Sequence, residues 1–126
     1  MRTLKFTVAL FFSLFISIAN AEDMAYLLNT TPTERAESQT RFMKAKLNLS
    51  LDDAAKIRAI NQKYAEKIEP VLKGPSISFF KMRDIKAILE EKDDILSSIL
   101  TPEQFDAYVN AKDELKQAMQ QDLNAR

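Results

Sequence analysis

The sequence contains no cysteine and no histidine, and it has a single glycine among 126 residues. Without cysteine no disulfide can support the fold, so helix packing or self-association has to stabilise it. Without imidazole or thiolate, a transition-metal site would have only carboxylates and methionines as ligands, and a serine nucleophile would have no histidine as its base. One glycine cannot build a phosphate-binding loop. We therefore expect no enzymatic activity, no cofactor and no metal centre.

Three pairs of adjacent acids, Asp52-Asp53, Glu90-Glu91 and Asp93-Asp94, are the remaining candidates for carboxylate chemistry. Neighbouring positions of a helix point in different directions, so the two members of a pair do not converge on one ion. We interpret these pairs as solvated helix faces and helix-terminal acids.

The only long apolar run lies at the N-terminus. Arg2 and Lys5 precede a largely apolar run over residues 6–18, and Ala19-Asn20-Ala21 supplies a small-x-small cleavage site. This pattern predicts a signal peptide that is cleaved before Glu22. The run is shorter than the roughly 20 residues of a membrane-spanning helix, so we expect no membrane insertion after cleavage. Export without cysteine suits a bacterial periplasm.

The remaining 105 residues carry 16 basic and 18 acidic side chains, a net charge of −2. Nucleic-acid binding requires a basic stripe along one face, and the composition does not suggest one. The length is compatible with one domain and one modest core. We expect a mobile arm at 22–30, where periodicity is weak, and a single helical domain at 31–126.

Apolar residues recur at helical spacing in the domain, and no segment alternates with a period of two. The sequence therefore predicts an all-α fold of four helices, of which the last three are long, at about 32–46, 51–72, 76 or 78 to 99, and 102–124. Thr31 and Glu34 form a capping box at the first helix. Pro70 is expected to kink or end the second helix nearby, and Gly74 to stop it from a C′ position.

Two further helix starts carry related capping residues. Thr101 has the side chain of an N-cap, Pro102 fits the first helical turn, and Gln104 stands at N3, where its amide can reach back to the cap. Ser50 and Asp53 repeat this arrangement in a weaker form 51 residues earlier. We assign these residues a structural capping role and no contact with a substrate.

The pattern Leu100-Thr101-x-x-Gln104, with the degenerate copy Leu49-Ser50-x-x-Asp53 and a secretion signal, resembles the LTxxQ-motif family of periplasmic stress proteins. That family includes Spy-type chaperones and CpxP-type inhibitors of an envelope-stress sensor kinase. The resemblance implies a bent helical hairpin arrangement and an antiparallel, cradle-shaped homodimer. It also implies either protection of unfolded proteins without ATP or docking to the sensor domain of a kinase.

One row of the third helix alternates steps of three and four, as a coiled-coil seam does: Ile85, Ile88, Lys92, Ile95 and Ile99. Two interpretations stay open, a face packed within one chain and a seam between two chains.

Surface recognition is the function that remains. Phe79 and Phe80 are adjacent, so they cannot easily face one core. One could be core and the other a staple over the turn, or one could belong to an exposed patch with Phe42, Met43 and Met82. Aromatic and methionine side chains adapt to many partner shapes. The candidate protein-binding residues are Arg35, Arg41, Phe42, Met43, Lys46, Phe79, Phe80 and Met82.

Three functions follow as hypotheses. The first is a periplasmic, ATP-independent chaperone-like protein whose partners are unfolded or misfolded envelope proteins, bound on a concave helical surface. The second is a CpxP-like regulator whose partner is the periplasmic domain of a stress sensor kinase. The third is a structural helical bundle whose apolar stripes are all internal.

Overall fold

Residues 21–125 are described by the computed structural model, and every regular element in this range is a helix. The elements are α2 (Ala21–Asn29), α3 (Pro32–Leu47), α4 (Leu51–Lys73), α5 (Ser78–Ile99), α6 (Pro102–Asn110) and α7 (Lys112–Asn124). The predicted all-α class is confirmed, but the described part of the chain has six helices and not four. The predicted signal peptide lies outside the described residues except for its last position, Ala21.

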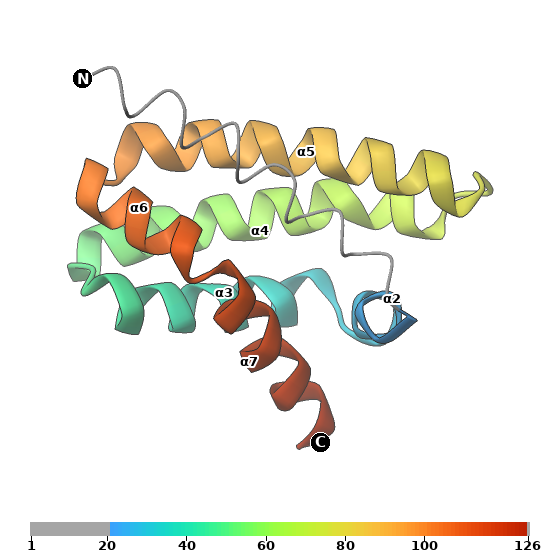
Figure 1. Ribbon diagram of the computed structural model, residues 1–126, viewed down its shortest axis with the longest axis horizontal. Helices are drawn as coiled ribbons and strands as arrows, with labels where there is room; N and C mark the ends of the chain where they lie inside the picture. The colour runs from blue at the N-terminus through green and yellow to red at the C-terminus, as the bar shows by residue number, and fades with distance from the viewer. Residues whose placement is uncertain (1–20, 126) are drawn as a thin grey trace.

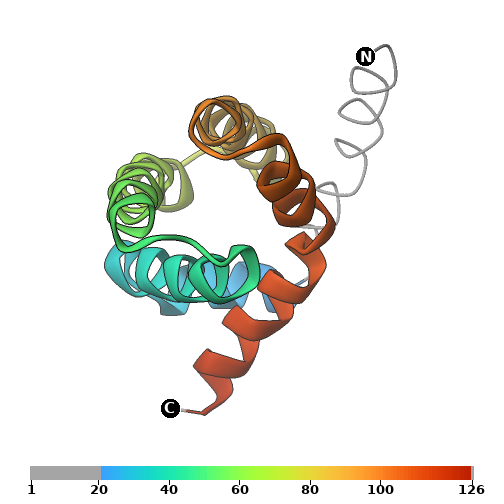
Figure 2. The same ribbon diagram turned by 90° about the vertical axis from the view of Figure 1, so that its left-hand side faces the viewer.

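The three longest helices run back and forth beside one another, and the two C-terminal helices cross back toward the first of them (Figure 1). Helix α3 contacts α4, α6 and α7, while α5 contacts α4 and α6. Viewed along the long helices, α3, α4, α5 and the α6–α7 pair surround a common interior (Figure 2). The chain therefore closes a ring of helices on itself.

The two related capping motifs form at the starts of α4 and α6. Thr101 Oγ1 accepts from Gln104 N at 3.1 Å, and Gln104 Oε1 accepts from Thr101 N at 3.0 Å, which completes the capping box. Ser50 Oγ accepts from Asp53 N at 3.1 Å. Each cap satisfies backbone donors that the first helical turn leaves without an intrahelical partner.

The leucines that precede the two caps bring the motifs together. Leu49 and Leu100 are both buried and belong to the same core cluster, although they are far apart in sequence. Gln104 Nε2 also lies 3.5 Å from the carbonyl oxygen of Leu47, the last residue of α3. The two turns therefore share one end of the bundle.

Helix α3 begins and ends with defined caps. Thr31 and Glu34 form the predicted capping box, with Glu34 Oε2 2.8 Å from Thr31 N. At the other end Asn48 adopts a left-handed conformation, with φ 51° and ψ 51°. Asparagine tolerates this region better than other non-glycine residues, so it can reverse the chain between α3 and α4 without glycine.

The segment 22–30, where we expected a mobile arm, is instead occupied by helix α2. Tyr26 and Thr30 at its C-terminal end are buried, and Thr30 Oγ1 donates to the carbonyl of Tyr26 at 2.6 Å. Arg35 Nη1 holds the carbonyl oxygens of Leu27 and Thr30 at 3.0 and 2.7 Å. These side-chain contacts, which periodicity does not reveal, fix the end of the segment on the bundle.

The helix predicted from 102 to 124 is broken at Ala111, where the backbone has φ −95° and ψ 4°. The amide of Ala111 is shared between the carbonyls of Ala107 and Tyr108. No proline or glycine marks this break in the sequence. At this break the chain changes direction, so that α7 packs on α3 and α2 (Figure 1). A straight helix continuing α6 could not reach them.

Pro70 does not end α4, which continues to Lys73. Gly74 follows as the C-cap in an extended conformation, with φ −69° and ψ 166°, and not in the left-handed region expected for a C′ glycine. A Cβ at this position would lie 3.0 Å from the carbonyl oxygen of Pro70. The glycine is therefore explained by close backbone approach.

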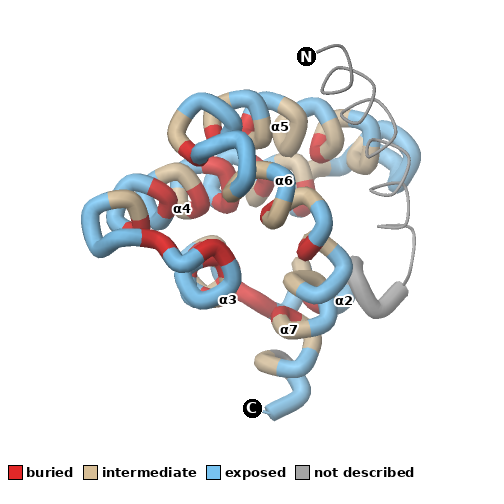
Figure 3. Tube along the Cα trace, turned by 60° about the vertical axis from the view of Figure 1, so that its left-hand side comes forward, coloured by how far each residue is buried: buried red, intermediate tan, exposed pale blue. Residues whose placement is uncertain are grey.

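The apolar core consists of two clusters, and buried positions face the interior of the bundle (Figure 3). The larger cluster lies around the two capped turns and contains Met43, Leu47, Leu49, Ala54, Ile57, Leu96, Leu100 and Tyr108. The smaller one contains Ile68, Leu72 and Ile85. Polar side chains are buried as well, namely Thr30, Arg35, Ser38, Thr40, Asn61 and Lys92.

The cap of α6 gives a direct test of the capping assignment. We expect Thr101→Ala to lower the free energy of unfolding by about 1 kcal/mol, because it removes the acceptor for the amide of Gln104. Thr101→Ser keeps the hydroxyl and should stay within a few tenths of a kcal/mol of the wild type. Urea unfolding followed by circular dichroism measures both. Equal stability of the alanine and serine variants would contradict the assignment.

Candidate functional site

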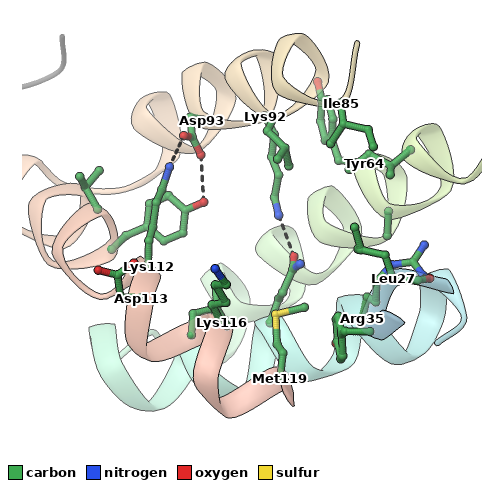
Figure 4. A pocket seen from close by; sticks show the side chains of 18 of the residues that line it. Leu27, Arg35, Tyr64, Ile85, Lys92, Asp93, Lys112, Asp113, Lys116 and Met119 are labelled. Carbon is green, nitrogen blue, oxygen red and sulfur yellow. Dashed lines mark hydrogen bonds and ion pairs between the residues drawn. The ribbon is translucent and has the colours of Figure 1, made fainter. Parts of the chain in front are cut away.

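A partly enclosed pocket of about 230 Å³ lies in the interior that the helices surround, and we call it the central pocket. Side chains from all six described helices line it. Its apolar wall includes Tyr26, Leu27, Ile68, Ile85, Leu89 and Met119. Figure 4 shows the polar side chains of α5 and α7 that project into the same space. The pocket therefore combines an apolar surface with a few charged groups, as small-molecule sites do.

Lys92 is the most unusual residue of this pocket. Its side chain is 5% exposed and crosses the pocket from α5 toward α3, where Nζ donates to Gln39 Oε1 at 2.7 Å (Figure 4). Burial lowers the pKa of Lys92 from 10.5 to about 8; the nearby Asp93 carboxylate opposes this shift, and Lys112 adds to it. The ammonium is thus held inside the bundle by a neutral amide.

Asp93 connects α5 to the C-terminal helices. Its two carboxylate oxygens accept from Tyr108 Oη at 2.9 Å and from Lys112 Nζ at 2.5 Å. Burial raises the pKa of the Tyr108 hydroxyl, and the negative charge of Asp93 raises it further. Because Lys112 directly follows the break at Ala111, this ion pair fixes where α7 begins.

Arg35 was predicted to bind a protein partner, and the structure contradicts this. Its side chain is only 2% exposed. In addition to the carbonyls of α2, it binds Glu69 on α4 at 2.5 Å. Burial of Glu69 favours its neutral form, but hydrogen bonds from Lys73 and Arg35 outweigh this and lower the pKa of Glu69. Arg35 therefore holds α2, α3 and α4 together.

The other predicted residues of α3 do not form one accessible surface either. Met43 is buried in the larger core cluster, whereas Phe42 is half-buried. Arg41 and Lys46 are exposed but face acids of α7, at 3.8 Å from Asp122 and 2.8 Å from Glu114. The cations of α3 thus contribute to the packing of α7.

Phe79 and Phe80 are both exposed, whereas the alternatives proposed for the pair placed one ring in the core or only one ring in an exposed patch. They lie at the start of α5 with 70% and 42% of their surfaces accessible, and their rings meet edge to face at 5.5 Å. Ile77 beside them is 65% exposed, and Met82 is half-buried. We call Ile77, Phe79 and Phe80 the apolar tip.

The predicted patch of Phe42 and Met43 with the apolar tip does not exist as one surface. Phe42 precedes the turn between α3 and α4, whereas the tip follows the turn between α4 and α5. These turns lie at opposite ends of α4, whose 23 residues extend about 35 Å. The structure therefore separates the two halves of the predicted site.

The coiled-coil-like row of residues on α5, for which two interpretations stayed open, packs largely within the chain. Ile85 and Lys92 are buried, and Ile88, Ile95 and Ile99 are half-buried. A lysine in a row of isoleucines was the sequence signal for the central pocket. Its meaning was missed because the residues around it come from five other helices.

Two further properties concern only the described residues. Among residues 21–125, no group of three or more acidic side chains is placed so that it could hold a metal ion. In the same range, no helix has both the length and the apolar character needed to cross a membrane.

The burial of Lys92 predicts a stability that depends on pH. Below pH 8 Lys92 is charged in both states, and its burial opposes folding; between pH 8 and 10.5 the unfolded chain binds more protons, so stability rises with pH. We expect Lys92→Met to be more stable than the wild type by roughly 2 to 3 kcal/mol at pH 7, since one pKa unit corresponds to about 1.4 kcal/mol. The difference should shrink as the pH rises from 8 to 10.

Urea unfolding at several pH values measures this difference. Lys56→Met removes an exposed charge from α4 and should leave stability within about 0.5 kcal/mol at each pH. A Lys92→Met variant that is less stable than the wild type at pH 7 would mean that the bond to Gln39 outweighs the cost of burial.

Comparison with known proteins identifies one family. A family model described as a domain of unknown function (DUF4890) matches residues 20–108, from the start of the described chain to Tyr108 in α6. No curated protein and no solved structure matches the chain significantly. Since the matched region covers more than half of the sequence, the chain belongs to the DUF4890 family.

Proposed function

We propose that this protein is a periplasmic, ATP-independent chaperone-like protein that binds unfolded or misfolded envelope proteins. The observation that carries the proposal is the apolar tip. Ile77, Phe79 and Phe80 lie within four consecutive residues and expose 65%, 70% and 42% of their surfaces. Contiguous apolar side chains on the surface of a soluble domain are typical of sites that bind other proteins.

The side chains around the tip support binding through apolar and aromatic contacts. Its neighbouring cations are compensated within the chain: Lys73 pairs with Glu69 at 2.8 Å and Arg83 with Asp84 at 3.2 Å. Arg83 lies over the Phe80 ring at 5.0 Å. Half-buried Met82 adds an adaptable side chain at the edge.

The resemblance to the LTxxQ-motif family supports the same assignment. Both motifs act as helix caps, and their leucines share one core cluster, so they define the bundle and leave client binding to another surface. We extend the proposal to a homodimer, in which the half-buried Ile88, Ile95 and Ile99 of α5 would meet a second copy. The signal-peptide pattern supports periplasmic location.

Aggregation of an unrelated unfolding protein, followed by light scattering without ATP, tests the proposal. We expect the purified protein to suppress aggregation in proportion to its concentration. In the double variant Phe79→Ser, Phe80→Ser, half-maximal suppression should require at least about tenfold more protein, because two exposed aromatic contacts are lost.

Leu51→Ser is the matched control. Leu51 is 76% exposed but lies at the opposite end of α4, so its loss should change suppression by less than about twofold. Equal effects at Leu51 and at the tip would contradict a specific site. No suppression by the wild type, together with a one-to-one complex with a kinase sensor domain, would favour the CpxP-like regulator. The absence of both activities would favour the structural bundle.

A further inference from the structure

We propose that the central pocket binds a single-chain aliphatic carboxylate of about eight carbons, with Lys92 Nζ facing the carboxylate and the chain against the apolar wall. This is a small-molecule site inside the bundle, separate from the apolar tip. The proposal rests on the size of the pocket, the partner of Lys92 and the charge pairing within the lining.

The size of the pocket limits the ligand. A cavity of about 150 Å³ accommodates benzene, which has six heavy atoms, so roughly 25 Å³ is needed for each. The central pocket, at about 230 Å³, then holds about nine heavy atoms. Octanoate has ten, and because the pocket is partly open the last atom need not be fully enclosed. A lipid with two acyl chains and a folded peptide segment are both too large.

The position of Lys92 identifies the head group. An ammonium has three N–H donors, and Gln39 Oε1 accepts from one of them at 2.7 Å. A buried charge is stable only when it is paired and hydrogen-bonded, which a neutral amide achieves in part. A ligand carboxylate would supply the missing negative charge. The lowered pKa of Lys92, about 8, is consistent with an ammonium that lacks a full counter-charge.

Charge pairing within the lining sets Lys92 apart from the other cations. The lining contains four cations, Arg35, Lys92, Lys112 and Lys116, and two carboxylates, Asp93 and Asp113. Asp93 already accepts from Lys112 and Tyr108, so it is compensated within the chain. Lys116 projects from α7 into the same space as Lys92 (Figure 4). Arg35 pairs with Glu69 and Lys112 with Asp93, whereas the buried Lys92 is bonded to a neutral amide.

The apolar wall accounts for the chain of the ligand. Ile68, Ile85 and Leu89 come from α4 and α5, and Leu27 and Met119 from α2 and α7. Each methylene buried against such a surface tightens binding about fourfold. Butanoate, which is four methylenes shorter than octanoate, should therefore bind at least a hundredfold more weakly.

Isothermal titration calorimetry with octanoate tests the proposal on the purified protein. We expect saturable one-to-one binding by the wild type and a dissociation constant at least tenfold larger for Lys92→Met, because a charged hydrogen bond is lost. Lys56→Met removes the same charge from the exposed surface of α4 and should bind octanoate as the wild type does. Neutral 1-octanol should bind the wild type and Lys92→Met within about threefold of each other.

The 1-octanol measurement distinguishes recognition of the carboxylate from a structural role of Lys92, which would weaken both ligands alike. Circular dichroism verifies that Lys92→Met is folded, as its expected stability requires. The proposal is overturned by absence of saturable octanoate binding at millimolar concentration, or by equal octanoate affinities of Lys92→Met and the wild type. Equal loss of octanoate and 1-octanol in a folded variant would also overturn it.

The outcome is independent of the proposed chaperone function. The variant Phe79→Ser, Phe80→Ser changes residues outside the central pocket and should retain octanoate binding. Lys92→Met leaves the apolar tip intact and should retain suppression of aggregation. Failure of one proposal can therefore be recognised without affecting the other.

Discussion

The meeting of two capped turns at one end of the bundle is the constraint on which the fold depends. Ser50 and Thr101 each start a helix, and the preceding leucines, Leu49 and Leu100, enter one core cluster. Because each cap fixes the entry direction of its helix, α4 and α6 leave the same apolar centre at set angles. The amide of Gln104 also reaches the last carbonyl of α3, so one motif joins three helices.

Away from these turns the interior of the bundle contains charged side chains. They affect the stability of the fold and line the central pocket. Arg35 and Lys92 are buried between helices, where they replace side chains that would otherwise fill the core. Arg35 is compensated by Glu69 and backbone carbonyls, whereas Lys92 has a neutral amide and a cavity beside it. A chain without disulfides keeps a costly buried charge here, which gives the pocket its preference for an anion.

The two proposed sites occupy different parts of the molecule. Cations of α3 face acids of the same chain, whereas the aromatic residues at the start of α5 are exposed. Arg41 and Lys46, which the sequence offered as a binding strip, face the acids of α7. Phe79 and Phe80 lie in the first turn of α5, directly after the α4–α5 turn, and both are exposed. Of the predicted protein-binding residues, those at the start of α5 therefore form an accessible apolar surface, and Arg35 and Met43 belong to the interior.

Local chemistry determined the helical class, the starts of α3, α4 and α6 and the end of α4, because caps, helical periodicity and a glycine act within a few residues. The sequence also pointed to Lys92 as an exception in an apolar row. Only the tertiary structure decided the helix at 21–29, the break at Ala111 and the central pocket. Each depends on contacts that form only in the folded chain: Arg35, itself bound to Glu69, holds the end of α2, Asp93 binds Lys112 beside the break, and six helices line the pocket.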